Sequence, residues 1–514
     1  MSASTGLRWA SRFAGNTAVL AASYGLNTVL AAVVAILLIQ HLGRDEYGVL
    51  TTIYSYLSFF IILTSVGVDT VVQRDVARAP ERAAEIVSRA LGLRLALSVG
   101  SLVLAVLLLP LLRPTPRVAI LVIVALASFP FSFHSLFLVR YSVELRMGLP
   151  KLVFGVWSIL LTLTKLGLIA LGAPLAAFVF LEPVSAAVIY AVSRVLGRRS
   201  GLDVSPRLDR QGWMGLLRLS WPVAVASLFI QVYLRIDHLM LYRMSGEGAV
   251  GLYGAATRLI EFPYVIPVVF MASAFPLLAR FEAESADRLR RATELSFRAM
   301  ALVSLPMAVA IALYGGGVMV LLLGEEFAAA VPILTVLAWA VPPAFANGVL
   351  LNRLFSTGHP QVGAWAAGLT AFLNVGLNLA LIPRHGGVGA AWATAVSYAA
   401  VVPLALAFPA SRSPAAMALL GSVFPERDRH ARAVDAEHRL ARPGRAEHER
   451  GVAHGDRPAF RRIDQVQRQR AIHRRHGRQI GPHGLGRDRC AGHLPRRAAA
   501  RGSLPAAPRT SARP

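Results

Sequence analysis

Six ionisable side chains interrupt the long apolar stretches of this sequence. They are Lys165, Arg235, Arg258, Glu182, Asp237 and Glu261. A charged side chain inside a hydrocarbon layer is costly unless it is paired or faces water, so such residues commonly belong to binding sites or ion pathways. Basic side chains bind phosphate, and carboxylates bind cations or carry protons. We therefore expect the three cations to be substrate-binding candidates and the three acids to be ion-coupling or ion-pair candidates.

The depth of the six residues supports a shared location. Counted from the expected outer end of its own span, each lies roughly 7–15 Å deep at a rise of 1.5 Å per residue. Arg258 and Glu261 are three residues apart and share a helix face, whereas Arg235 and Asp237 are two apart and cannot. Two interpretations stay open. The charges either form an ion-pair network that holds two halves together, or line a water-filled cavity that binds pyrophosphate or another acidic head group.

The elements that carry these residues are expected to be membrane-spanning helices. Residues 1–410 of the 514 consist largely of Leu-, Ala- and Val-rich stretches of about 20 residues, which is enough to cross roughly 30 Å of hydrocarbon. In hydrocarbon the backbone must satisfy its own hydrogen bonds, so these spans are helical. We predict an all-α polytopic membrane protein with twelve spans, which begin near Thr17, Tyr47, Ile86, Arg117, Pro150, Pro174, Ser220, Gly251, Ser296, Ala328, Gln361 and Val388.

Basic residues predict the orientation of these spans. With the N-terminus in the cytoplasm, the cytoplasmic segments hold 22 of the 30 Lys and Arg residues before residue 411, and the outer loops hold five. This asymmetry is what the positive-inside rule describes. The remaining three are the in-span cations, so the other 27 are assigned to loops or span ends.

A weak internal repeat predicts the domain organisation. Tyr47-Gly48 opens the second span and Tyr253-Gly254 opens the eighth, 206 residues later. Because the offset is six spans, an even number, the halves would be parallel repeats related by an axis along the membrane normal. We expect an N-terminal lobe over residues 1–200 and a C-terminal lobe over residues 201–410, each with six helices.

Residues 411–514 differ sharply from the rest. They contain 23 arginines and nine acidic residues, and the whole chain has a net charge of +25. Too few apolar residues are present to build a core, which predicts disorder. One alternative is a basic tail that binds anionic lipid or nucleic acid. The other is translation out of frame, which the abrupt change in composition favours, so we expect no nucleic-acid partner.

Motifs for enzyme chemistry are missing from the sequence. It contains no G-x-x-x-x-G-K-[ST] nucleotide-binding loop, no His, Cys and carboxylate cluster with metal-ligand spacing, and no serine elbow. We expect a protein that is not an enzyme and uses neither cofactor nor metal. Transport would then draw on a proton, a sodium ion or the membrane potential, through Glu182, Asp237 or Glu261.

Three segments carry a family resemblance. Residues 38–48 (LIQHLGRDEYG), 250–259 (VGLYGAATRL) and 374–398, with its LIP-x-x-G-x-x-GAA pattern, resemble the Wzx-like oligosaccharide and polysaccharide flippases. These belong to the multidrug/oligosaccharidyl-lipid/polysaccharide (MOP) exporter superfamily. The surroundings of Asp237 match as well. The resemblance covers most of residues 1–410 and none of the tail, where relatives often have two further helices.

The resemblance implies a V-shaped pair of six-helix lobes around a cationic cavity, as in MATE transporters. It implies export of undecaprenyl-pyrophosphate-linked oligosaccharide by alternating access across the bacterial cytoplasmic (inner) membrane, for lipopolysaccharide or exopolysaccharide. Membrane lipids and a polysaccharide polymerase machinery are the implied partners. Three rivals stay open. One is a cation-coupled multidrug antiporter on the same scaffold, and another is a membrane glycan polymerase or ligase, which the short outer loops disfavour. The third is a scaffold protein that has lost transport activity.

Overall fold

The computed structural model describes residues 3–144, 146–356 and 360–407, and these form helices and turns without a strand. They lie within one compact unit, Met1–Arg432. Residues 408–514 are not described, so both predictions for the tail fall outside the described residues. Within the described part the all-α prediction is confirmed.

The first half of the chain forms the following elements, in which η marks a 3₁₀ helix: α1 (Ala3–Ser65), α2 (Val68–Arg78), η1 (Pro80–Arg82), α3 (Ala83–Leu108), η2 (Leu109–Leu112), α4 (Pro116–Leu126), η3 (Phe129–Phe131), η4 (His134–Leu138), α5 (Val139–Val143), α6 (Gly148–Ala170) and α7 (Leu175–Arg199). The second half forms α8 (Arg210–Ser245), α9 (Glu247–Glu261), η5 (Phe262–Tyr264), α10 (Val265–Glu284), α11 (Ala286–Leu323), η6 (Glu325–Ala330), α12 (Val331–Ala338), α13 (Val341–Ser356) and α14 (Pro360–Ala407).

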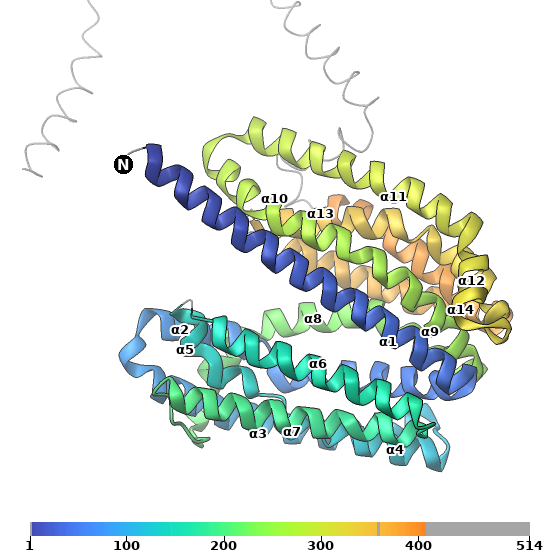
Figure 1. Cartoon of the computed structure of the whole chain (residues 1–514), viewed down its shortest axis with the longest axis horizontal. Coiled ribbons are helices and arrows are strands. Elements are labelled where there is room, and N and C mark those ends of the chain that lie inside the picture. The colour runs from blue at the N-terminus through green and yellow to red at the C-terminus, as the bar shows by residue number, and fades with distance from the viewer. Residues whose placement is uncertain (1–2, 145, 357–359, 408–514) are drawn as a thin grey trace, which may run out of the picture. The chain divides into compact units, whose positions relative to one another are not determined.

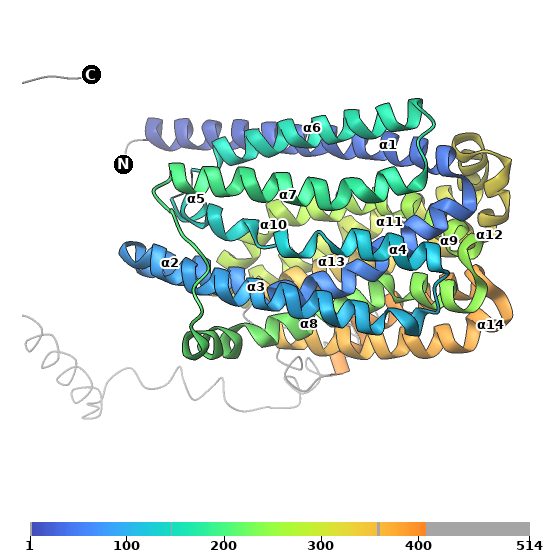
Figure 2. The same ribbon diagram turned by 90° about the horizontal axis from the view of Figure 1, so that it is seen from below.

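Helix α1 contains two spans, because the chain reverses at Gly43. Gly43 has φ 69° and ψ −179°, a backbone conformation that residues other than glycine rarely adopt, because their Cβ atom would clash. Ala31 and Ser55 line the same cavity although they are 24 residues apart. A straight helix would separate them by about 36 Å. In Figures 1 and 2 the ribbon of α1 turns back on itself accordingly.

Helix α14 reverses in the same way at Gly386, which has φ 53° and ψ −130°. Asn378 and Thr394 both hydrogen-bond Asp237, although a straight helix would separate them by about 24 Å. Nine helices in the described part are long and apolar enough to cross a membrane, or ten if the bent pair formed by η6–α12 and α13 is one span. Counting both arms of α1 and of α14 separately gives the twelve predicted spans.

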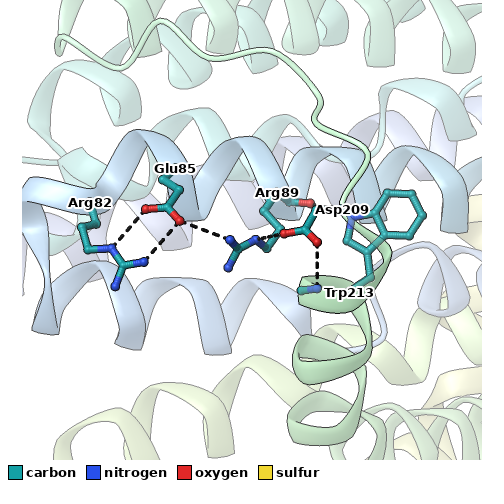
Figure 3. A network of polar contacts seen from close by, with 6 residues as sticks. Arg82, Glu85, Arg89, Asp209 and Trp213 are labelled. Atoms are coloured by element: carbon teal, nitrogen blue, oxygen red, sulfur yellow. Dashed lines mark hydrogen bonds and ion pairs between the residues drawn. The ribbon is translucent and has the colours of Figure 1, made fainter.

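The polar segment between α7 and α8 is fastened to α3. The Arg207 backbone N–H donates to the Ser88 carbonyl at 2.9 Å, and the Asp209 carboxylate lies 2.6 Å from the Arg89 guanidinium. Figure 3 shows this pair continuing along the helix to Glu85, which lies 3.2 Å from Arg89. The first turns of α8 are therefore attached to the first half of the chain.

Asp209 also caps α8. Its side chain accepts a hydrogen bond from the Gly212 N–H at 3.0 Å, and the Trp213 indole N–H donates to the Arg89 carbonyl at 3.2 Å. The Gly212 N–H, with the Arg89 guanidinium, holds the pKa of the Asp209 carboxyl below its usual value. The stabilising contribution of this carboxylate is present above its unfolded-state pKa and is lost as pH falls through the depressed value. The predicted division at residue 200 falls in this attached segment and stays a prediction.

Candidate functional site

A cavity of about 430 Å³ brings together four of the six predicted residues. Lys165 enters from α6, Arg235 from α8, and Arg258 and Glu261 from α9. Both arms of α1 complete the wall with small, hydroxyl and aromatic side chains, including Ser55 and Tyr54. The cavity is thus built by helices from both halves of the sequence.

Glu261 is shared between the two arginines of the cavity. Its carboxylate lies 3.0 Å from the Arg235 guanidinium and 3.2 Å from that of Arg258. Arg258 also stacks over the Phe262 ring, with 5.7 Å between the guanidinium carbon and the ring centroid. In the part of the chain that the structure describes, Lys165 has no ion pair. Three formal positive charges therefore face one negative charge.

This arrangement suits an anion rather than a cation. Each arginine is about two-thirds buried, with side-chain exposures of 36% and 38%, and one edge of each guanidinium is held by Glu261. A planar guanidinium can still offer a second edge to the paired oxygens of a phosphate. Lys165 adds a compact charge from a different helix. The cavity can therefore surround a di-anionic group from three helices.

Asp237 lies apart from this cavity, in a buried polar cluster. Only 2% of Asp237 is exposed. Its carboxylate accepts hydrogen bonds from the Tyr253 hydroxyl at 2.8 Å, the Thr394 hydroxyl at 2.5 Å and the Asn378 amide at 2.5 Å. Asn378 also donates to the Asn374 side-chain oxygen at 3.0 Å. The cluster joins α8, α9 and both arms of α14 without a basic side chain in hydrogen-bonding contact with Asp237 among the described residues.

His238 lies between the cavity and this cluster, and sequence reasoning missed it. It lines the cavity, and its ring lies edge-on to Tyr253 with 5.1 Å between the centroids. Both ring nitrogens are buried, and neither has a hydrogen-bond partner within the described residues. Such groups are costly, because they lose their bonds to water without replacement. The only signal in the sequence is that His238 follows Asp237.

Glu182 lines a second cavity of about 410 Å³ with Asp69, Arg94 and His134. The Arg94 side chain is 3% exposed and lies 3.1 Å from the Asp69 carboxylate. The assignment of Arg94 to a loop or span end is wrong, because α3 begins at Ala83 and holds this residue in its interior. Of the six predicted residues, the structure brings four together in the first cavity. Asp237 lies in a separate cluster, and Glu182 lines the second cavity, where the charge of Lys165 still acts on it.

The turn at Gly43 is tied to both halves of the chain. The Arg44 backbone N–H donates to the Glu326 carboxylate of η6 at 2.9 Å. The guanidinium of Arg117, in α4, makes two hydrogen bonds to the Glu46 carboxylate, at 2.6 and 2.7 Å. These contacts lie beyond the cavity, at the end of the spans where α1 reverses, and hold that end together.

Two glycines let α1 and α9 cross at backbone contact near this turn. A Cβ on Gly48 would overlap the Glu247 carbonyl, and a Cβ on Gly251 would overlap the Arg44 carbonyl. Small residues permit such close crossings of membrane helices. The crossing borders the cavity at this end, because Tyr47, next to Gly48, and Gly254, about one turn from Gly251, belong to its wall.

Comparison of the sequence with known proteins shows the family of this chain. The family model described as "Polysaccharide biosynthesis protein" matches residues 13–282, more than half of the chain. The chain belongs to this polysaccharide biosynthesis protein family. A second model, "Lipid II flippase MurJ", matches residues 186–417. The matched ranges include all six predicted residues, and together they extend over both halves of the described chain.

One curated relative of this family member is the "Probable flippase AglR" of Haloferax volcanii, 25% identical over 266 residues. The match covers 49% of this chain and 53% of the relative, so the chain spans about half of that protein's length.

Solved structures show the same fold. "Lipid II flippase MurJ, inward closed conformation" superposes with a TM-score of 0.61 at 13% identity, over 76% of this chain and 87% of that one. A multidrug resistance MATE family transporter of the MOP superfamily, in an inward-facing conformation, gives 0.59 at 16% identity, over 74% and 93%. This family member therefore has the MOP superfamily fold, as the resemblance implied. No group of three or more His, Cys, Asp or Glu that could hold a metal occurs among its described residues.

Proposed function

We propose that this protein is a flippase that moves undecaprenyl-pyrophosphate-linked oligosaccharide across the bacterial cytoplasmic membrane by alternating access. The N-terminus would face the cytoplasm, as the distribution of basic residues predicts. Residues 1–200 and 201–410 would act as the two lobes that rock around the cavity. The exported glycan would then pass to a polysaccharide polymerase machinery.

The observation that carries this proposal is the cavity shared by Lys165, Arg235 and Arg258. The three cations come from three helices and both halves of the chain, and Glu261 neutralises only one of the charges. A pyrophosphate would fit this excess of positive charge, and the polyprenyl tail would stay in lipid. A drug antiporter that binds cationic compounds would need an excess of negative charge in its cavity. The antiporter is therefore the weaker candidate.

Removing one cavity arginine should slow glycan export. We expect Arg258→Ala to bind a lipid diphosphate about tenfold to a hundredfold more weakly, because a hydrogen bond to a charged group contributes about 1.5–3 kcal/mol and each 1.4 kcal/mol is tenfold. The measurement is the amount of lipid-linked oligosaccharide and of surface glycan in a gene-deletion strain complemented with each variant. Export at the unmodified level with Arg258→Ala, Arg235→Ala and Lys165→Ala would remove the cavity from the mechanism.

Arg243→Ala is the matched control. Arg243 is an exposed arginine on α8, about two turns beyond Arg235, and it does not line the cavity. Its loss should leave export unchanged at equal protein abundance. If the deletion changes neither glycan pool and instead raises drug sensitivity, the antiporter replaces the flippase.

The Asp237 cluster is our proposed coupling site for a sodium ion or a proton. Its groups are carboxylate, hydroxyl and amide oxygens, the hard donors that alkali and alkaline-earth cations prefer. The Asn378 side-chain oxygen is buried and has no partner among the described residues, so it can serve as a further donor. Because the cluster joins α8, α9 and both arms of α14, a bound cation would change how these helices pack.

Asp237→Asn should uncouple transport from its ion gradient. The amide keeps the shape of the carboxylate, but it lacks the charge that would hold a cation. In proteoliposomes we expect the variant to lose the stimulation by a sodium or proton gradient, while it binds lipid diphosphate as before. Asp203→Asn, which changes a 71% exposed carboxylate in the segment between α7 and α8, is the control. Undiminished gradient stimulation in Asp237→Asn would reject the cluster as the coupling site.

A further inference from the structure

The second cavity offers both hydrogen-bond donors and acceptors in a fixed arrangement. Arg94 donates to the Asp69 carboxylate at 3.1 Å and to the Ser132 carbonyl at 2.9 Å. The Ser135 hydroxyl donates to the other Asp69 oxygen at 2.9 Å. Both charged side chains are thus held in one orientation from three elements. Because these side chains already have fixed orientations, they can bind a ligand without losing further side-chain freedom.

Glu182 is the uncommitted acid of this wall. It is half-buried in α7, and it has no ion pair within 4.0 Å and no side-chain hydrogen bond within the described residues, although the Lys165 charge of the first cavity is close enough to act on it. His134 and the hydroxyls of Ser65, Ser128 and Ser185 lie around the same space. A partly buried carboxylate without a hydrogen-bond donor is unfavourable at membrane depth, so a ligand with such donors would stabilise it.

The formal charge of this cavity is opposite to that of the first. Asp69 and Glu182 outnumber Arg94 here, whereas three cations outnumber Glu261 in the first cavity. A phosphate would be repelled by the second cavity and attracted by the first. Neutral hydroxyl groups suit the second, because carboxylates accept from them and Arg, His and Ser side chains donate to them.

The two cavities follow each other along the same helices. The second arm of α1 lines the first cavity with Tyr54 and Ser55 and the second with Ile61 and Ser65. Ten residues from Ser55 to Ser65 correspond to about 15 Å at helical rise. Helix α7 repeats this order, with Phe178 in the first cavity and Glu182 in the second. One elongated ligand can therefore occupy both.

Helices α6 and α7 are joined beside the two cavities. The Trp157 indole N–H donates to the Ser185 hydroxyl of the second cavity at 3.1 Å, and the neighbouring Ser158 lines the first. An indole presents an apolar face together with one fixed polar edge. Trp157 lines neither cavity, but its hydrogen bond holds the Ser185 hydroxyl that lines the second.

We propose that the second cavity is a neutral glycan subsite, in which Glu182, His134 and the Asp69–Arg94 pair bind sugar hydroxyls while the first cavity binds the diphosphate of the same molecule. This inference rests on the proposed flippase function and deepens it. It assigns Glu182 to glycan recognition instead of ion coupling. It also explains why one site has an excess of cations and the next an excess of carboxylates.

The test compares two probes on the purified full-length protein in nanodiscs. Farnesyl diphosphate supplies an isoprenoid diphosphate without sugar, and lipid-linked oligosaccharide extracted from the deletion strain supplies the same chemistry with the glycan. We expect Glu182→Gln to weaken binding of the lipid-linked oligosaccharide about tenfold, as for one hydrogen bond to a charged group. Binding of farnesyl diphosphate should stay unchanged. His134→Gln, a second variant, should act in the same direction.

Lys165→Ala is the comparison variant. Both probes carry the diphosphate that Lys165 is proposed to bind, so this variant should weaken the binding of both probes by the same factor. Equal weakening of both probes by Glu182→Gln, or no effect on either, overturns the glycan subsite while the flippase proposal stands. Failure of the unmodified protein to bind either probe overturns the flippase proposal and the subsite with it. Asp69 is not a suitable test position, because its loss also affects the fold.

Discussion

Replacing Asp69 with alanine should destabilise the folded protein by about 3 kcal/mol, the lower end of the loss when one partner of a buried ion pair is removed, because Arg94 is buried but Asp69 is 33% exposed. The Arg94 guanidinium, whose side chain is 3% exposed, would keep only its hydrogen bond to the Ser132 carbonyl within the described residues. Its charge would then remain in a poorly hydrated place without a counter-ion. The measurement is the thermal midpoint of the purified protein in detergent, which should fall clearly.

The double variant Asp69→Ala/Arg94→Met distinguishes a lost ion pair from lost packing. Replacing both partners with apolar groups is often neutral or stabilising, so most of the stability should return. Asp75→Ala is the matched control: Asp75 is about as exposed as Asp69, but its partner Arg74 is 44% exposed, so this pair should contribute at most about 1 kcal/mol. A double variant as unstable as Asp69→Ala alone would show that packing, not charge, explains the effect.

The fold was largely predictable because the requirement that creates it is local. A span must be about 20 apolar residues long whatever its neighbours are, so length and hydropathy give its position. The polar segment around Gly43 interrupts two such stretches, and the structure reverses there. Contacts between distant spans are not local. The sequence related Tyr47-Gly48 to Tyr253-Gly254 as a repeat, but it gave no sign that their helices cross in contact.

The site was predictable in part, for a related reason. Residue type and depth selected Lys165, Arg235, Arg258 and Glu261, which do share a cavity. The direction in which a helix face points depends on tertiary packing, which composition does not encode. Asp237 therefore proved to face a different cluster from Arg235, and Glu182 a different cavity. The two-residue spacing had indicated only that Arg235 and Asp237 point apart.

Arg94 is a buried charged residue that was not among the predicted site residues. It was counted as a loop or span-end cation, although the predicted third span begins near Ile86, eight residues before it. Helix α3 begins at Ala83, close to that prediction, and Arg94 lies inside it and pairs with Asp69 of α2. The sequence carries both charges, but their pairing depends on how α2 and α3 pack.

Alanine at Gly48 or Gly251 should open the end of the cavity at which α1 reverses. A Cβ at either position would overlap a carbonyl of the facing helix, so the two helices must separate. Overpacking of this kind costs about 1–3 kcal/mol, enough to shift an equilibrium between closed and open crossings by about 5- to 150-fold. The readout is labelling of a cysteine at Thr257, in the cavity wall, by a membrane-impermeant maleimide added to each side of vesicles, with Cys490→Ser as background.

We expect both variants to label faster from the side of this crossing, the outer side in the proposed orientation, and to bind lipid diphosphate still. Gly100→Ala in α3 and Gly167→Ala in α6 are matched controls, because a Cβ there meets no atom within 4 Å. Each should be neutral or slightly stabilising, since alanine suits a helix better than glycine. If Gly48→Ala and Gly251→Ala label no faster than these controls while their thermal midpoint falls, the crossing is a fixed packing contact rather than a gate. Alternating access would then have to open the cavity elsewhere, and Gly48 and Gly251 would serve only to pack α1 against α9.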